Sequence, residues 1–260
     1  MGKKVWMVLA AGAALAGPVM AQGAADAAQQ LADDVKALPQ GFFSGWAGNV
    51  SLGVTGSDGN TERFNFRASA DGVRETDRNK TTFLAWYSYA KDDSATSENK
   101  AQALLNNDYL FDDSPWFAFS RAQLEYDEFQ AWDTRLSLYG GAGRVLIDDD
   151  KTNLLGKVGV GALKEIGSDD TAWRGEGIIT FELTHQISER QKLTAVLDIF
   201  PDLGDASHVR TRARAVWELA VDPETNMALR IGAEDRYDND PSGNARKNDV
   251  DFFAMLTWAY

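Results

Sequence analysis

Apolar and polar residues alternate with a period of two along most of this chain. The end of the chain is the clearest case, because aspartates there alternate with apolar residues of one parity. That apolar set is Val250, Phe252, Ala254, Leu256, Trp258 and Tyr260. Successive side chains of a strand point to opposite faces, so the pattern predicts a strand with one apolar face. A final strand that ends on an aromatic residue is typical of bacterial outer-membrane barrels, and Phe252, Leu256, Trp258 and Tyr260 are its expected assembly signal.

The same alternation recurs from residue 44 to the end, in about 12 segments of about 10–16 residues, a length that suits tilted transmembrane strands. No sustained helical period interrupts it. We therefore predict an all-β fold: an antiparallel transmembrane up-and-down β-barrel of about 12 strands.

The connections between these segments alternate in length. Short turns are expected at residues 77–79, 112–114, 148–150, 188–190 and 222–224. Longer loops are expected at residues 56–61, 91–99, 167–171, 201–207 and 238–248, with a tight exception at 130–131. Outer-membrane barrels have short periplasmic turns and longer extracellular loops, so this alternation argues against a soluble β protein.

The start of the chain predicts export. Lys3 and Lys4 precede an apolar run that is too short to span a bilayer as a helix, and small residues follow it. We assign residues 1–21 to a signal peptide and residues 22–43 to a periplasmic leader, either a short helix or disordered. Residues 44–260 then form the barrel.

Composition excludes several chemistries. The formal charge of −13 argues against binding to nucleic acid, because phosphate binding needs a basic surface. The chain has no cysteine, so a thiol nucleophile or a Cys-ligated metal is impossible. Its two histidines, His185 and His208, lie in different segments and belong to no catalytic motif. We therefore expect no enzyme activity, no catalytic residue, no cofactor and no protein-bound metal centre.

Charged residues occupy the polar faces of many predicted strands, as they would in a narrow lumen. The candidate lumen residues are Arg121, Glu125, Asp133, Arg135, Arg174, Glu176, Glu182, Arg210, Arg212, Arg214 and Glu218. Arg210, Arg212 and Arg214 share one parity, so they form a ladder that points one way. The ladder is either an anion-selective stripe or a set of cations paired with acids on neighbouring strands, namely Glu176, Glu182, Asp198 and Glu218.

Two further features have a structural and a functional interpretation. The glycine-rich stretch at residues 140–143 predicts a crowded strand, where bulky side chains or the leader approach the wall. The expected outer loops are acidic, and such clusters could hold Ca²⁺ or Mg²⁺ bridged to lipopolysaccharide phosphates. No EF-hand spacing occurs among them, so solvated surface charge is the alternative.

The chain resembles the salt-induced outer-membrane proteins of the YdiY type, a domain of unknown function. Trp46, Gly53 and the Gly-Asn-Thr of residues 59–61 carry this resemblance, together with the short motifs at residues 107–111, 126–129, 133–143, 237–241 and 247–249. They span almost the whole chain after the leader. The resemblance implies an outer-membrane β-barrel with no assigned biochemical function.

Two functions follow as hypotheses. The charged lumen suggests a narrow solute or ion channel, linked to osmotic or salt stress. The acidic loops and the lack of a substrate motif suggest instead a non-conducting structural envelope protein that binds lipopolysaccharide or divalent cations. In both cases the expected location is the bacterial outer membrane. The expected partners are its lipid and lipopolysaccharide and, during biogenesis, periplasmic chaperones and the barrel-assembly machinery.

Overall fold

The structure is a computed structural model that describes residues 45–57, 63–93, 95–168, 171–241 and 246–259. The predicted signal peptide, the predicted leader and Tyr260 lie outside these residues. Within the described residues, no helix is long and apolar enough to cross a bilayer.

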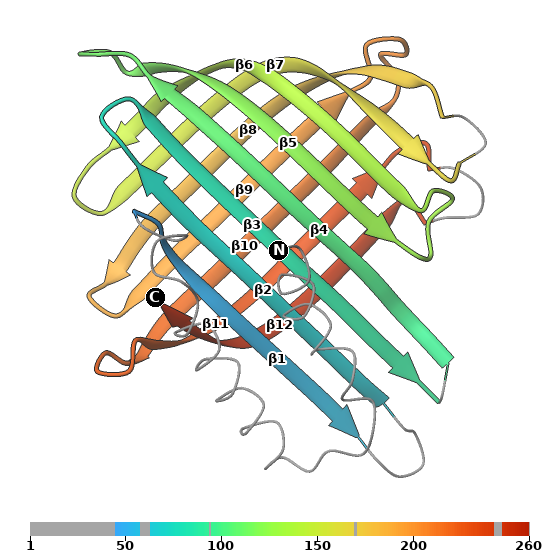
Figure 1. Ribbon diagram of the computed structural model, residues 1–260, viewed down its shortest axis with the longest axis horizontal. Helices are drawn as coiled ribbons and strands as arrows, with labels where there is room; N and C mark the ends of the chain where they lie inside the picture. Colours follow the sequence, from blue (N-terminus) through green and yellow to red (C-terminus); the bar gives the residue numbers. More distant parts are fainter. Residues whose placement is uncertain (1–44, 58–62, 94, 169–170, 242–245, 260) are drawn as a thin grey trace, which may run out of the picture. The chain divides into compact units, whose positions relative to one another are not determined.

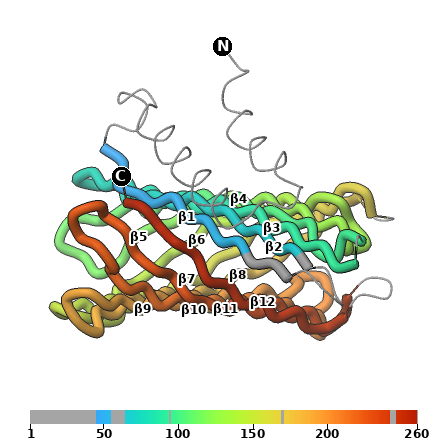
Figure 2. The backbone as a smooth tube through the Cα atoms, turned by 90° about the horizontal axis from the view of Figure 1, so that it is seen from below, coloured from blue at the N-terminus to red at the C-terminus, as the bar shows by residue number. Residues whose placement is uncertain are grey.

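Twelve antiparallel strands form one closed barrel (Figure 1). They are β1 (Ala47–Ser57), β2 (Arg63–Glu75), β3 (Asn79–Asp92), β4 (Ala95–Leu110), β5 (Trp116–Asp127), β6 (Thr134–Asp148), β7 (Thr152–Ile166), β8 (Trp173–Ser188), β9 (Gln191–Pro201), β10 (Val209–Asp222), β11 (Met227–Asp238) and β12 (Asn248–Ala259). Each strand pairs with the next along the chain, and the pairing of β1 with β12 closes the sheet. Figure 2 shows β12 in red beside β1 in blue at this seam. Closure matters because it leaves no unpaired strand edge.

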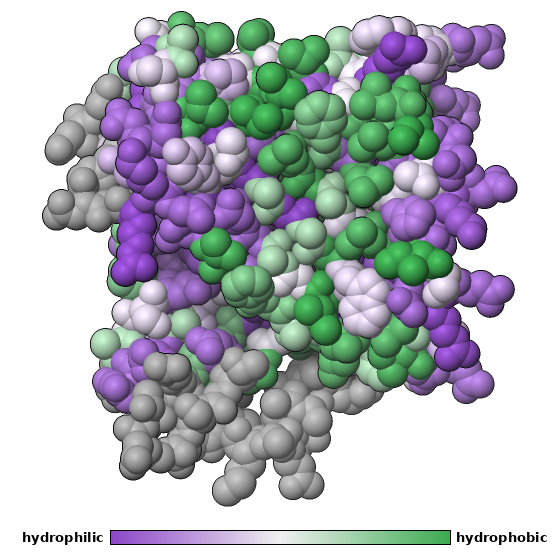
Figure 3. Space-filling model, turned by 180° about the vertical axis from the view of Figure 1, so that it is seen from behind, coloured by the Kyte–Doolittle hydropathy of each residue, from purple (hydrophilic) through white to green (hydrophobic). Residues whose placement is uncertain are grey.

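The predicted alternation sets the two faces of the wall. Val160 and Phe252 are 62% and 82% exposed, as outward residues of a membrane barrel should be. Their inward neighbours Lys157 and Met255 are buried. On the face in Figure 3, apolar side chains gather between hydrophilic margins at the two ends of the barrel.

The two ends of the barrel differ in their connections. One end, here called the turn end, carries the connections at residues 76–78, 111–115, 149–151, 189–190 and 223–226. The other, here called the loop end, carries those at residues 58–62, 93–94, 128–133, 167–172, 202–208 and 239–247. Two expectations were wrong: β3 and β4 continue through the predicted loop at 91–99, and residues 128–133 form a wider connection than the predicted tight turn.

Aromatic and aliphatic side chains also fill part of the interior, which the sequence pattern did not predict. Phe117, Phe119, Tyr139, Ile178 and Phe200 form one buried cluster. A second cluster combines Val216, Phe253 and Met255. These residues point inward on the same strand faces as the charged residues. The faces that look polar in the sequence therefore also carry the apolar core of the lumen.

Glycines in the wall make room for these rings. A Cβ atom on Gly141 would lie 2.9 Å from Cε1 of Phe119, and one on Gly143 would clash with the ring of Phe117. Real Cβ atoms do not approach a neighbour so closely, so glycine is required where a ring lies flat on the strand. The predicted crowding is confirmed at Gly141 and Gly143 but not at Gly140. The Phe117 ring causes it at Gly143, and the backbone of β7 together with the Phe119 ring causes it at Gly141.

Candidate functional site: the lumen and its vestibule

The arginine ladder of β10 points into the lumen, and its first member is paired as expected. Arg210 donates to Glu176 of β8, with Nη2 2.8 Å from Oε1. The hydroxyl of Tyr139 donates to the same carboxylate, and the guanidinium lies 5.1 Å from the centroid of the Phe200 ring. A carboxylate that leaves water needs such partners, so this group is a neutral, fully bonded unit in the wall.

The other two members of the ladder do not pair with the acids that the sequence suggested. Arg212 crosses the lumen to Glu125 of β5, a strand on the opposite side of the barrel. Arg214 forms no ion pair with any side chain that the structure describes, and its guanidinium lies 5.4 Å from the centroid of the Phe253 ring. The three arginines of the ladder therefore differ: Arg210 is paired along the wall, Arg212 is paired across the lumen, and Arg214 has no acidic partner among the described side chains.

Ion pairs also cross the lumen at other points. Arg121 of β5 reaches Asp198 of β9, with Nη1 2.7 Å from Oδ1. Lys157 of β7 lies 3.0 Å from both Asp108 of β4 and Glu182 of β8. Arg121 and Lys157 are almost fully buried. These buried ion pairs link β5 to β9 and β7 to β4 through the lumen.

A further set of charges lies toward the turn end. Arg230 of β11 contacts Glu218 at 2.6 Å and also pairs with Asp71 of β2 across the β1–β12 seam. Glu218 is also 2.9 Å from Lys192. Two cations and two acids thus compensate one another. Glu218 therefore pairs with Arg230 and Lys192 and not with the arginine ladder that the sequence suggested.

At the loop end, Arg135 and Arg174 share one carboxylate. Glu165 lies 2.5 Å from Nη2 of Arg135 and 3.1 Å from Nη2 of Arg174. Trp132 shares the parity of Leu136 and Leu138, so alternation alone predicts that it faces outward. In the structure it is 7% exposed and stacks on Arg135 at 4.3 Å. The outward assignment was wrong because Trp132 belongs to the 128–133 connection, where strand parity does not apply.

One candidate lies outside the lumen. Asp133 is exposed in the 128–133 connection, so it does not belong with the other candidate lumen residues. Further buried charged residues were not among the candidates, although strand parity places them on the inward face. They are Arg67, Lys100, Asp108, Asp127, Lys157, Glu165 and Glu234.

A cavity of about 80 Å³ opens at the loop end, and we call it the vestibule. Arg135, Arg174, Arg210 and Arg212 contribute to its lining. It has room for only a few water molecules, because each needs about 10–15 Å³ by this measure. The vestibule therefore borders the ladder at Arg210 and Arg212.

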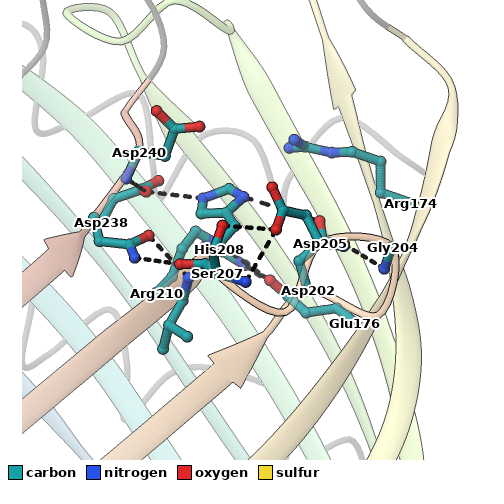
Figure 4. A network of polar contacts seen from close by, with 12 residues as sticks. Arg174, Glu176, Asp202, Gly204, Asp205, Ser207, His208, Arg210, Asp238 and Asp240 are labelled. Carbon is teal, nitrogen blue, oxygen red and sulfur yellow. Dashed lines mark hydrogen bonds and ion pairs between the residues drawn. The ribbon is translucent and has the colours of Figure 1, made fainter.

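His208 ties the loops together beside the vestibule. Its Nε2 lies 2.9 Å from Oδ1 of Asp238, and its ring is placed between Asp238 and Asp202 (Figure 4). The Asn239 side chain donates to the Ser207 carbonyl and accepts from a backbone N–H of β10. Connections 202–208 and 239–247 are thus joined by several polar contacts.

The aspartates of these loops accept hydrogen bonds from neighbouring residues of the same loops. Asp202 accepts from the backbone N–H groups of Gly204 and Asp205. Asp205 accepts from the hydroxyl and backbone N–H of Ser207, and these bonds lower the pKa of Asp205. In the described part of the chain, no group of three or more His, Asp or Glu side chains is arranged to hold a metal ion.

Three of the four expected assembly-signal residues are described. Phe252 and Leu256 are exposed on the outward face of β12, and Trp258 shares their parity. Tyr260 lies outside the described residues.

Closed strand pairing, an apolar outer face and a charged interior together define the class of transmembrane-type β-barrels. The chain belongs to a family of proteins of unknown function, DUF481, whose model matches residues 50–260. The resemblance to YdiY-type proteins is consistent with this family.

Several solved barrels are similar to the chain at low identity. A NanC porin shares 11% identity, with 82% of this chain and 97% of that chain covered and a TM-score of 0.46. The COG4313 outer membrane channel from Pseudomonas putida F1 shares 12% identity, with coverage of 83% and 95% and a TM-score of 0.46. The translocator domain of the autotransporter NalP from Neisseria meningitidis shares 12%, with coverage of 94% and 99% and a TM-score of 0.43. No curated protein matches the chain.

Proposed function

We propose that this protein is a bacterial outer-membrane barrel whose lumen is closed to solutes, and that it serves the envelope as a structural protein. The observation that carries the proposal is the set of ion pairs across the lumen. Arg121 with Asp198 joins β5 to β9, and Lys157 with Asp108 joins β7 to β4, so both pairs link strands that are not neighbours in the wall. Opening a path there would separate buried charges from their partners, which costs several kcal/mol for each uncompensated ion.

The loop end is then the extracellular side and the turn end the periplasmic side, as short turns favour. In this orientation the outward apolar face contacts lipid, and lipopolysaccharide surrounds the loop end. The barrel-assembly machinery and periplasmic chaperones are the expected partners during biogenesis.

Conductance in a planar bilayer tests the closed lumen. The refolded protein is first shown to be a barrel by a shift in gel mobility on heating. We expect a heat-modifiable protein that stays silent under applied voltage. Discrete current steps from the unmodified protein would overturn the closed-lumen proposal.

A narrow anion channel is the second candidate, because Arg135, Arg174 and Arg210 line the vestibule at the loop end. Rings of arginine favour anions in pores. If current steps are seen, the triple variant with Arg210, Arg212 and Arg214 changed to Gln should lose anion preference. Unchanged selectivity in that variant would remove the ladder from the selectivity mechanism.

We also propose a role under osmotic or salt stress, which rests on the family resemblance and on the envelope location. Growth of a deletion strain across a range of salt concentrations tests this role. We expect reduced osmotic tolerance or altered envelope permeability, both restored by the unmodified gene. A deletion strain that matches its parent in both properties would contradict the proposed role.

A further inference from the structure

A cluster of charged side chains lies inside the barrel, near the β1–β12 seam. Arg67 comes from β2, Arg212 and Arg214 from β10, and Glu234 from β11. Phe253 of β12 forms an apolar wall, with the Arg67 guanidinium 4.5 Å and the Arg214 guanidinium 5.4 Å from its centroid. Two like charges therefore share one aromatic ring, an arrangement that needs a counter-charge nearby.

Glu234 supplies only part of that counter-charge. It is 1% exposed, and its carboxylate lies 3.8 Å from Nη2 of Arg67 and 3.7 Å from Nε of Arg212. Both distances are too long for a hydrogen bond. Arg67 and Arg212 thus form long ion pairs with this carboxylate, but neither donates a hydrogen bond to it.

Six buried side-chain atoms that have no hydrogen-bond partner among the described residues lie together in this cluster. Nε and Nη2 of Arg67, Nε of Arg212 and Nε of Arg214 are buried and have no partner in the described part of the chain. Both carboxylate oxygens of Glu234 are also buried and have no hydrogen-bond partner within the residues that the structure describes. Buried polar groups in native proteins are nearly always bonded, so unpartnered groups that converge on one place indicate a bound species between them.

The charge balance shows what kind of species fits. Three guanidinium groups in this cluster face two carboxylates, Glu234 and Glu125, of which Glu125 is already paired with Arg212. On one side, Arg230 and Lys192 compensate Asp71 and Glu218. Around the other sides, Lys100 and Arg236 face Asp251, Glu98 and the buried Asp127, and Arg121 and Lys157 face Asp108, Glu182 and Asp198. The excess of one positive charge is therefore local to the cluster, where Arg214 has no ion pair with any described side chain.

We propose that this cluster binds a small inorganic anion of the halide class, chloride in a physiological medium. A halide accepts several N–H bonds at once and neutralises the remaining charge. Water alone could satisfy the hydrogen bonds but would leave that charge uncompensated, which is costly in a buried site. A cation is disfavoured by the three surrounding guanidinium groups.

The vestibule gives the anion a route of entry. Arg212 lines the vestibule and also reaches Glu234. Trp86 lines it too, and its ring lies 4.4 Å from the Arg67 guanidinium. The halide site lies directly behind these two vestibule residues. The site does not depend on whether the lumen conducts, because exchange through the loop end is sufficient.

Urea unfolding of the protein isolated from membranes tests the site, with sodium chloride compared with sodium gluconate at equal ionic strength. A ligand that binds only the folded state shifts the folded-to-unfolded ratio by about 11-fold at a tenfold excess over its Kd. We expect the unfolding midpoint to rise with chloride, to reach a plateau, and to stay constant in gluconate. Superimposed chloride and gluconate curves would overturn the proposal.

Substitutions separate anion binding from a merely structural role. Arg214→Gln removes the uncompensated charge, so chloride dependence should be lost; a structural role alone would lower the midpoint equally in both salts. Glu234→Gln adds to the positive excess, so saturation should occur at a lower chloride concentration. Arg144→Gln is the matched control, because Arg144 is exposed on the outward parity of β6 and stacks near Trp116. This control should keep the full chloride effect.

Crystals grown in bromide give a direct readout that does not rely on any variant. An anomalous peak within hydrogen-bond distance of Nε of Arg67, Arg212 or Arg214 is the expected result. Density that fits water only, with no anomalous signal in the cluster, would show that the gap is simply hydrated and would refute the halide site.

Discussion

Each charged side chain inside this barrel depends on a partner that another strand supplies. Glu176 illustrates this, because its carboxylate is 2% exposed and bonded by both Arg210 and Tyr139. A buried pair adds little net stability compared with apolar residues, whereas removing one partner leaves the other charge buried alone. At the scale of single residues, the lumen is therefore sensitive to the loss of one group and tolerant of balanced changes.

Replacing Glu176 by Ala should destabilise the folded barrel by about 3–5 kcal/mol, because Arg210 is left buried and unpaired. Urea unfolding in detergent or lipid vesicles measures the change. Glu189→Ala is the control: Glu189 is exposed in the connection at residues 189–190, and its loss should have almost no effect. Equal stability of the two variants would contradict the proposed role of the pair.

Glycine positions in β6 differ in a way that substitution can detect. Gly141→Ala should cost about 1–3 kcal/mol, because its Cβ would overlap the Phe119 ring and the backbone of β7. Gly140→Ala places its Cβ no nearer than 3.7 Å to another atom and should be tolerated. Unfolding midpoints of the two variants give the comparison, and a tolerated Gly141→Ala would mean that both the ring and the β7 backbone can shift.

At the scale of elements, each strand has a lipid-type face and a lumen face, while the connections follow other rules. β12 shows the first point, since Phe252 and Leu256 are exposed and Phe253 and Met255 are buried. The 202–208 connection shows the second, because aspartates there bind backbone N–H groups. A substitution should therefore act through lipid, through the lumen or through loop order, according to its position.

Leu256→Arg should impair insertion of β12 and closure of the barrel. A cation on the lipid face costs about 2–4 kcal/mol near the bilayer midplane and less toward the interfaces. The yield of heat-modifiable barrel after refolding into vesicles is the measurement. Asn248→Arg, at the exposed start of the same strand, is the control and should refold normally. Normal insertion of Leu256→Arg would contradict the assignment of this face to lipid.

Acid should loosen the 202–208 connection. Hydrogen bonds from Ser207 lower the pKa of Asp205, so they stabilise the loop above the ordinary pKa of an aspartate, about 3.9. This stabilisation is lost as the pH falls through the lower pKa of the folded state. Hydrogen exchange at the Ser207 amide, corrected for its intrinsic pH dependence, should show protection at neutral pH and loss of it in strong acid. Asp205→Ala should lack this protection at every pH; an unchanged profile in that variant would rule out Asp205 as the cause.

At the scale of the whole molecule, the closed barrel brings together charges that are far apart along the chain. Arg121 and Asp198 meet although three strands of the wall lie between β5 and β9. The same closure places Arg67 of β2 near Glu234 of β11. Occlusion of the lumen is thus a property of the assembled wall, because no single strand or hairpin contains both partners.

Balanced removal of the cross-braces should open the lumen. A variant with Arg121, Lys157, Asp108 and Asp198 changed to Ser removes two cations and two acids, so the formal charge is unchanged. We expect this variant to refold and to show current steps in a planar bilayer, while the unmodified protein stays silent. The control replaces Arg78 and Asp112 by Ser, an exposed pair at the turn end, and should remain silent. A folded but silent four-residue variant would locate the barrier elsewhere in the lumen.

The sequence by itself determined most of the charged residues that face the lumen and how many strands carry them. Strand parity is a local property, so alternation was enough to place Arg210, Arg212 and Arg214 on one inward face. Turn residues and the spacing of apolar runs similarly determined twelve strands and most of their connections. The final aromatic alternation of β12 indicated an outer-membrane type of barrel, although Tyr260 itself lies outside the described structure.

Only the tertiary structure decided which of these residues meet. Arg212 donates its hydrogen bond to Glu125 across the lumen, and Arg214 is left beside Phe253. Trp132 turns inward onto Arg135. These contacts depend on how the tilted strands close into a barrel, and pairing across a lumen leaves no signal in the spacing of residues along one strand. The sequence therefore determined the wall, and the closure of that wall decided the chemistry inside it.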